Sequence, residues 1–141
     1  MRVVLDTNVW VSALLWLGLP HNLLDLAEAG TIILAMTHPL VKELREVLAR
    51  PKFASALAAR RTSVATLMQG VLVLVELYSA STLVEAVAAD ADDNAVIACG
   101  LAAQAQWIIS GDEHLLSLGT YKGIRIGTTR QFLEAEFPER L

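Results

Sequence analysis

Short apolar runs that alternate with longer segments of helical periodicity restrict the fold of this chain more than any other feature. An apolar run bounded by Asp, Gly or Pro is typical of a buried strand, and alternation with helices favours parallel strands joined by crossovers. The sequence therefore predicts an α/β fold with a mainly parallel sheet. We expect strands over residues 2–5, 32–36, 71–77, 107–110 and 124–126. We expect helices over residues 9–16, 21–29, 39–49, 52–60, 63–69, 91–105, 113–118 and 129–137.

One of these assignments keeps an alternative. The run 71–77 is rich in Val, which favours a strand, but an apolar run of this length also fits a buried helix.

Composition places the chain among compact globular proteins. Hydrophobic residues make up 55% of its 141 residues and charged residues 18%, a balance that argues against disorder and predicts a sheet covered on both faces. The length predicts one domain over residues 1–141. The single cysteine, Cys99, cannot form an internal disulfide, so we expect a reducing, cytoplasmic compartment. The apolar run 9–19 contains Ser12 and is too short to span a bilayer, so we expect no membrane segment.

Acidic residues gather where the predicted strands end. Asp6 follows the first strand, and Asp112 follows the strand 107–110. The carboxyl ends of parallel strands share one edge of the sheet, where functional groups collect. A third acidic group lies at the start of the helix 91–105 and consists of Asp90, Asp92 and Asp93. One of these could serve as a helix cap, but a cap does not explain three acids in four positions.

Converging carboxylates indicate a bound cation. Carboxylates that share a buried site repel each other unless a cation holds them. Oxygen ligands without His or Cys suit Mg²⁺ or Mn²⁺, which activate water for attack on a phosphate. The sequence has neither a glycine-rich phosphate loop nor a Ser or Cys nucleophile motif, so we expect water to be the nucleophile.

Four segments resemble the motifs of PIN domains. Residues 3–9, Val-Val-Leu-Asp-Thr-Asn-Val, resemble the opening strand of that family, and residues 41–48, Val-Lys-Glu-Leu-Arg-Glu-Val-Leu, resemble its acidic helix. Residues 90–94 together with 108–112, Ile-Ile-Ser-Gly-Asp, look like its second acidic half. The resemblance runs from Arg2 to about Leu133. It is strongest to the VapC-like toxins of bacterial type II toxin–antitoxin pairs.

The resemblance implies a three-layer α/β/α sandwich and metal-dependent cleavage of RNA, with an antitoxin protein as partner. It implies that Asp6, Glu43, Asp93 and Asp112 are catalytic and that Asp6, Asp93 and Asp112 bind the metal. Supporting roles fall to Asn8, Asp90, Asn94 and Ser110. We also expect a homodimer. Many PIN domains carry an acid where this chain has Asn94, so the third acidic ligand is open among Asp90, Asp92 and Asp93, of which we favour Asp93.

Two other functions remain open. A phosphatase of the haloacid-dehalogenase type also begins with an aspartate after its first strand, but it needs a second aspartate where this chain has Asn8. A catalytically inactive PIN-like module that binds RNA or a partner protein would fit Asn94.

Basic residues concentrate in one segment. Residues 42–61 carry a net charge of +4, while the whole chain carries −4. Such asymmetry suggests a polyanionic partner, and Arg45, Arg60 and Arg61 are the expected contacts to RNA or to an acidic antitoxin segment. A solvated helical face is the alternative for the same residues.

Overall fold

Six strands form one sheet in the order β3-β2-β1-β4-β6-β5. The computed structural model describes residues 1–80 and 91–141, and for 91–93 the backbone alone. All neighbouring strands are parallel except β5 and β6. The strands are β1 (Arg2–Leu5), β2 (Ile33–Met36), β3 (Glu76–Leu77), β4 (Trp107–Ile109), β5 (Thr120–Tyr121) and β6 (Ile124–Gly127).

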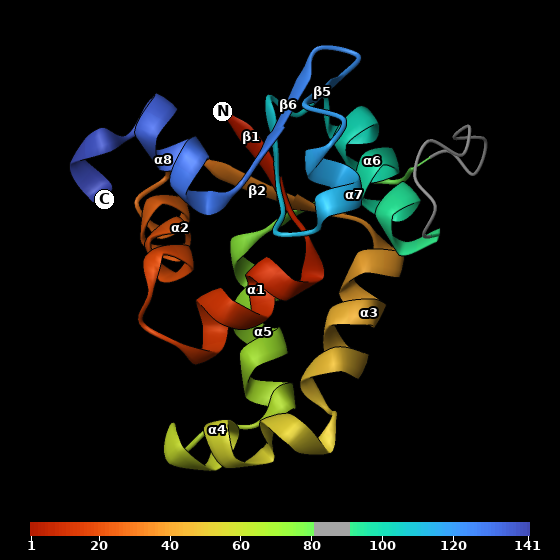
Figure 1. Ribbon diagram of the computed structural model, residues 1–141. Coiled ribbons are helices and arrows are strands. Elements are labelled where there is room, and N and C mark those ends of the chain that lie inside the picture. The colour runs from red at the N-terminus through yellow and green to blue at the C-terminus, as the bar shows by residue number, and fades with distance from the viewer. Residues whose placement is uncertain (81–90) are drawn as a thin grey trace.

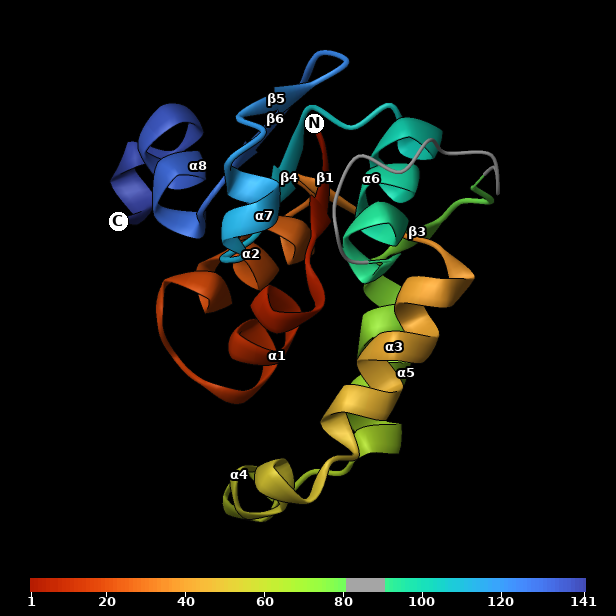
Figure 2. The ribbon, with the colours of Figure 1, turned by 45° about the vertical axis from the view of Figure 1, so that its right-hand side comes forward.

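Helices connect these strands and pack on both faces of the sheet. They are α1 (Thr7–Leu15), α2 (Leu19–Glu28), α3 (His38–Leu48), α4 (Ala54–Ala59), α5 (Val64–Leu74), α6 (Ala91–Ala103), α7 (Glu113–Leu116) and α8 (Thr129–Glu136), with short 3₁₀ turns at Pro51–Phe53 and Pro138–Arg140. Helix α6 lies on one side of the central strands, and α2 and α8 lie on the other (Figure 2). The predicted three-layer α/β/α architecture is therefore confirmed.

Burial along β1 shows that both faces of the sheet are covered. Successive strand residues point to opposite faces, yet Val3 and Val4 are both fully buried. The same holds for Ile108 and Ile109 in β4, the neighbour of β1. The central strands therefore lie in the middle of the core, as the high apolar content predicts.

The prediction of a strand over 71–77 is wrong for most of its length. Ser63 caps α5 by accepting a hydrogen bond from the Thr66 amide, and the helix continues to Leu74. Met68 and Val71 are buried three residues apart on one helical face, so packing overrides the β propensity of valine. Only Glu76 and Leu77 pair with β2. The helical alternative is correct for residues 71–74, but of these only Val71 is buried.

Strand β5 was not expected. It pairs with β6 through a two-residue turn in which Lys122 and Gly123 have φ angles of 47° and 83°. Two successive positive φ values match a hairpin turn of type I′. The Lys-Gly pair is a weaker signal for that turn than Asn-Gly, which explains why the sequence did not reveal it.

Two helices extend from the carboxyl edge of the sheet towards α4. Helix α1 follows β1 and α3 follows β2, the two helices contact each other, and α4 lies across their far ends (Figure 1). Among the described residues no single helix is long and apolar enough to cross a membrane, and α1 with α2 reaches that length only as a pair bent by 87°.

Two glycines provide a matched test of the packing. A Cβ atom on Gly100 of α6 would lie 3.1 Å from Ile108 and 3.2 Å from Ile124, whereas one on Gly70 of α5 would meet nothing within 4 Å. We expect Gly100→Ala to lower the free energy of unfolding by about 1–3 kcal/mol through overpacking. Gly70→Ala should raise it by about 0.5–1 kcal/mol, since alanine is the better helix former. Urea unfolding measures both, and equal effects would contradict the close contact of α6 with the sheet.

Candidate functional site

The strand order places a topological switch point at the carboxyl ends of β1 and β4, and we call the region outside these two strand ends the crevice. The chain runs from β1 outwards to β2 and β3 and then returns to the opposite side of β1 as β4. Ligands bind at such switch points in open α/β sheets, because the helices on either side diverge there. Asp6 follows β1, while Ser110 and Asp112 follow β4. The expected placement of these residues at one edge of the sheet is therefore observed.

The hydroxyl group of Ser110 links the two aspartates. It donates a hydrogen bond of 2.7 Å to Oδ2 of Asp6 and accepts one of 2.9 Å from the backbone amide of Asp112. Leu5 is paired with Ile109, so continuing the register by one residue brings Asp6 next to Ser110. Ser110 is buried, and both aspartates are partly exposed. Their carboxylates are thus held on a rigid frame and remain accessible.

Backbone contacts fix this frame on both sides. The amide of Asp6 donates to the carbonyl of Ile109 at 2.9 Å, and the amide of Ser110 donates to the carbonyl of Gly127 at 3.0 Å. A Cβ on Gly127 would lie 3.0 Å from both Trp107 and Gln131, so this position has no room for a side chain. Sequence reasoning missed Gly127, because a strand glycine that supports a neighbour through its carbonyl leaves no motif.

Both aspartates also cap helices. Oδ1 of Asp6 accepts a hydrogen bond of 2.8 Å from the Thr7 amide at the start of α1. Oδ1 of Asp112 accepts one of 2.7 Å from the His114 amide at the start of α7. Backbone amides at a helix start stabilise a carboxylate. These contacts explain how two aspartates are tolerated at neighbouring strand ends.

The remaining predicted acids approach from other elements. Glu43 is half-buried on α3, which contacts α1 and α6. Helix α6 joins parallel strands and runs antiparallel to them, so its first turn lies at the same edge as Asp6 (Figure 2). Asn94 is half-buried in that turn, and the exposed Asn8 lies on the first turn of α1.

Three of the predicted residues lie outside what the structure describes. Asp90 is outside the described residues, and so are the side chains of Asp92 and Asp93. The backbone of Asp92 and Asp93 lies at the start of α6, at the same edge as Asp6, and the choice among the three residues stays a prediction.

The donor chemistry of the site fits a hard divalent cation. Within residues 1–80 and 94–141 no group of three His, Cys, Asp or Glu side chains converges. Asp6 and Asp112 nevertheless offer carboxylate oxygens at one crevice, and Mg²⁺ is commonly held by one or two carboxylates while retaining several waters. A third carboxylate from the start of α6 would complete the set.

Among the described residues, no cysteine is placed to act as a nucleophile in the crevice. Cys99 is buried in α6, and this burial raises the pKa of its thiol to about 12. The thiolate is therefore scarce at neutral pH, and the nucleophile is the thiolate rather than the thiol.

The basic residues predicted to contact RNA do not meet at the crevice. Arg45 is exposed on α3, whereas Arg60 and Arg61 lie at the end of α4, beyond the far ends of α1 and α3 (Figure 1). The guanidinium of Arg60 donates to the carbonyl of Leu14 at 3.1 Å and so braces α4 against the end of α1.

Comparison with known families identifies the class of this protein. The model of the family described as PIN domain matches residues 2–114, a range that includes Asp6, Glu43, Asp93 and Asp112. The chain therefore belongs to the PIN domain family, and this assignment disfavours the phosphatase alternative. Searches of curated proteins and of solved structures gave no match.

Removal of the Ser110 hydroxyl tests the frame. Ser110→Ala leaves Oδ2 of Asp6 and the Asp112 amide without this partner, so we expect the free energy of unfolding to fall by about 1–3 kcal/mol. Ser117→Ala is the matched control, since its hydroxyl donates only to the carbonyl of His114 at an exposed position. Denaturant titration compares the two variants. Equal effects would show that Ser110 does not hold the two aspartates.

Proposed function

We propose that this protein is a metal-dependent endoribonuclease that hydrolyses RNA phosphodiesters with water as the nucleophile. The observation that carries the proposal is the pair of aspartates, Asp6 and Asp112, joined through Ser110 at the switch point of a PIN domain. Asp6, Asp112 and Asp93 are the proposed ligands of Mg²⁺ or Mn²⁺.

A metal held by these residues would supply an activated water and would neutralise charge on the phosphate. The protein's own groups position the reactants. Ser110 keeps one oxygen of Asp6 oriented, and the Thr7 amide orients the other. Glu43 is the proposed group that orients the attacking water and accepts its proton, with Asn8, Asp90 and Asn94 in supporting roles.

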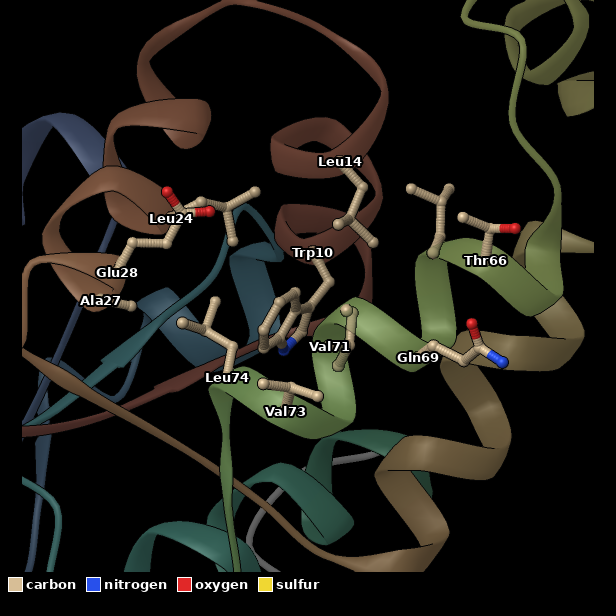
Figure 3. A pocket seen from close by; sticks show the side chains of 12 residues that line it. Trp10, Leu14, Leu24, Ala27, Glu28, Thr66, Gln69, Val71, Val73 and Leu74 are labelled. Atoms are coloured by element: carbon tan, nitrogen blue, oxygen red, sulfur yellow. The ribbon is translucent and has the colours of Figure 1, made fainter.

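We further propose that the nuclease is the toxin of a toxin–antitoxin pair acting in the cytoplasm. A groove of about 770 Å³ between α1, α2 and α5 supports a protein partner, because its lining is mainly apolar (Figure 3). Val73, on the rim of the groove, is 88% exposed. The indole Nε1–H of Trp10 is buried beside the groove without a hydrogen-bond partner. An apolar segment of an antitoxin fits this surface, and it would lie next to the helix that Asp6 caps.

The proposed homodimer has separate support. Leu72 and Leu77 are 40% and 51% exposed and line a second apolar hollow with Val41 of α3. Exposed apolar patches of this kind mark protein contacts more often than isolated exposed leucines do.

Replacement of Asp6 tests the metal mechanism. We expect the wild-type protein to cleave single-stranded RNA with Mg²⁺ or Mn²⁺ and to stop in EDTA. Asp6→Asn should abolish cleavage while keeping the fold, since Asn caps a helix about as well as Asp. At a metal concentration about a hundred times its Kd, Mn²⁺ should stabilise the wild type by about 2.7 kcal/mol, or about 5–10 °C in Tm, and Asp6→Asn should lose most of that shift.

The control is Asp25→Asn on α2, which removes a half-buried carboxylate outside the crevice. It should keep both cleavage and the thermal shift. Cleavage at full rate in EDTA would overturn the metal mechanism. A protein that binds RNA and Mn²⁺ but never cleaves would support the inactive module instead.

The toxin role predicts a partner that the groove captures. We expect an antitoxin encoded beside this gene to co-purify with the protein, and Val73→Asp to abolish that complex because it places a charge on the apolar rim. Ala65→Asp is the matched control, being exposed on the same helix but outside the groove. Light scattering measures the complex and reports the mass of the free protein. If the neighbouring product does not bind, or if both variants bind equally, the groove is not an antitoxin site.

A further inference from the structure

A basic and aromatic surface lies at the end of α1 that is farthest from the two aspartates. We define the distal platform as Trp16, Arg50, Lys52 and Arg61, all of them exposed. Trp16 ends α1, Arg50 and Lys52 flank the start of the 3₁₀ turn after α3, and Arg61 follows α4. The hydrogen bond from Arg60 to Leu14 holds α4 against the end of α1.

The charge of this region differs from that of the rest of the chain. Between Glu46 and Glu76 the sequence has four basic residues and no acidic one. The whole chain carries −4, so the positive charge is concentrated here. A local positive field on an acidic protein favours a polyanion at that place.

The platform also carries an exposed aromatic ring. Trp16 is 49% exposed, whereas Trp10 and Trp107 are 1% and 3% exposed. The centres of the Trp16 and Phe53 rings lie 6.3 Å apart with the ring planes inclined by 65°, and Nζ of Lys52 lies 5.1 Å from the centre of the Phe53 ring. An indole that is fixed on one side and open on the other, next to cationic groups, suits the stacking of an unpaired base.

Helix α1 connects the platform to the crevice. Asp6 caps its first turn and Trp16 its last, a separation of about 15 Å at 1.5 Å per residue. Asn8, Ser12 and Trp16 are spaced by four residues, so they form one stripe along the helix, and none of them is buried. The adjacent helix α3 carries Glu43 in its first half and ends at Leu48, and Arg50 lies just beyond that end, directly before the 3₁₀ turn.

We propose that the distal platform binds single-stranded RNA several nucleotides away from the cleaved bond, with one base stacked on Trp16 and phosphates near Arg50 and Lys52. This inference rests on the proposed nuclease function. Double-stranded RNA would not present an unpaired base to the indole. An acidic protein segment could pair with the cations, but it would not need an open indole in line with the crevice. Arg60 is not part of the platform, because its guanidinium is hydrogen-bonded to the carbonyl of Leu14 and holds α4 against the end of α1.

Binding of a labelled twelve-nucleotide single-stranded RNA, measured by anisotropy in EDTA, tests the platform without cleavage. Trp16→Ala should raise Kd about five-fold or more, the loss expected when a base loses its aromatic partner. Trp16→Phe should restore most of the affinity, and Leu17→Ala, at a neighbour that is even more exposed, should change it less than two-fold. A dinucleotide is too short to bridge the separation of about 15 Å between the crevice and the platform, so its cleavage with Mn²⁺ should not respond to Trp16→Ala.

The charge is tested with two matched lysines. Lys52 and Lys122 both lie over aromatic rings, at 5.1 Å and 5.5 Å, but Lys122 is in the β5–β6 turn. Lys52→Gln should lower the slope of log Kd against log salt concentration by about 0.7, as for one lost phosphate contact, and Lys122→Gln should not.

Suppose that the wild-type protein cleaves both RNAs but that neither Trp16→Ala nor Lys52→Gln changes the binding of the twelve-nucleotide RNA. The proposed RNA-binding platform would then be wrong, while the proposed nuclease function would stand. If Trp16→Ala and Lys52→Gln weaken the binding of polyglutamate but not the binding of RNA, the platform binds an acidic protein segment and the RNA proposal is wrong. Absence of metal-dependent cleavage, with RNA binding still dependent on Trp16, would instead remove the proposed nuclease function.

Discussion

Asp6 and Ser110 meet because β1 and β4 are parallel neighbours whose register ends at Leu5 and Ile109. Every other feature of the crevice depends on that pairing. The hydroxyl of Ser110 reaches Asp6 on one side and the Asp112 amide on the other, and Gly127 of β6 holds Ser110 in place from behind. A shift of one residue between β1 and β4 would turn these side chains to the opposite face of the sheet.

The same arrangement explains how a largely apolar chain keeps two partly exposed carboxylates at the edge of its sheet. Asp6 and Asp112 each accept hydrogen bonds from the amides of a helix that begins beside them. These contacts offset part of the cost of placing two carboxylates at neighbouring strand ends. A divalent cation would offset more of that cost. Helix capping and metal binding both stabilise the charged carboxylate, so one aspartate can serve in both roles. The exposed cations Arg50, Lys52 and Arg61 lie near the far ends of α1 and α3, away from the crevice.

Much of the fold follows from the sequence, and the limits have physical causes. Buried strands such as residues 2–5 and 107–110 lie between polar breaks, so the local pattern and the tertiary structure agree. The run 71–77 was misjudged because tertiary packing of Met68 and Val71 selects a helix that valine alone does not favour. At the site, Asp6 and Asp112 are recognisable from their places after strands, whereas Gly127 acts through its backbone and Arg60 through a contact across 46 positions. Neither contact leaves a local pattern.

The central claim is that the crevice between the ends of β1 and β4 holds a divalent metal. The anomalous difference map of a crystal grown with Mn²⁺ measures this directly, because it locates the metal without reference to activity. The account predicts a peak at bonding distance from carboxylate oxygens of Asp6 and Asp112, with a further ligand from the first turn of α6. A crystal saturated with Mn²⁺ that shows no peak in this crevice, or shows the metal bound only at surface carboxylates, would contradict it.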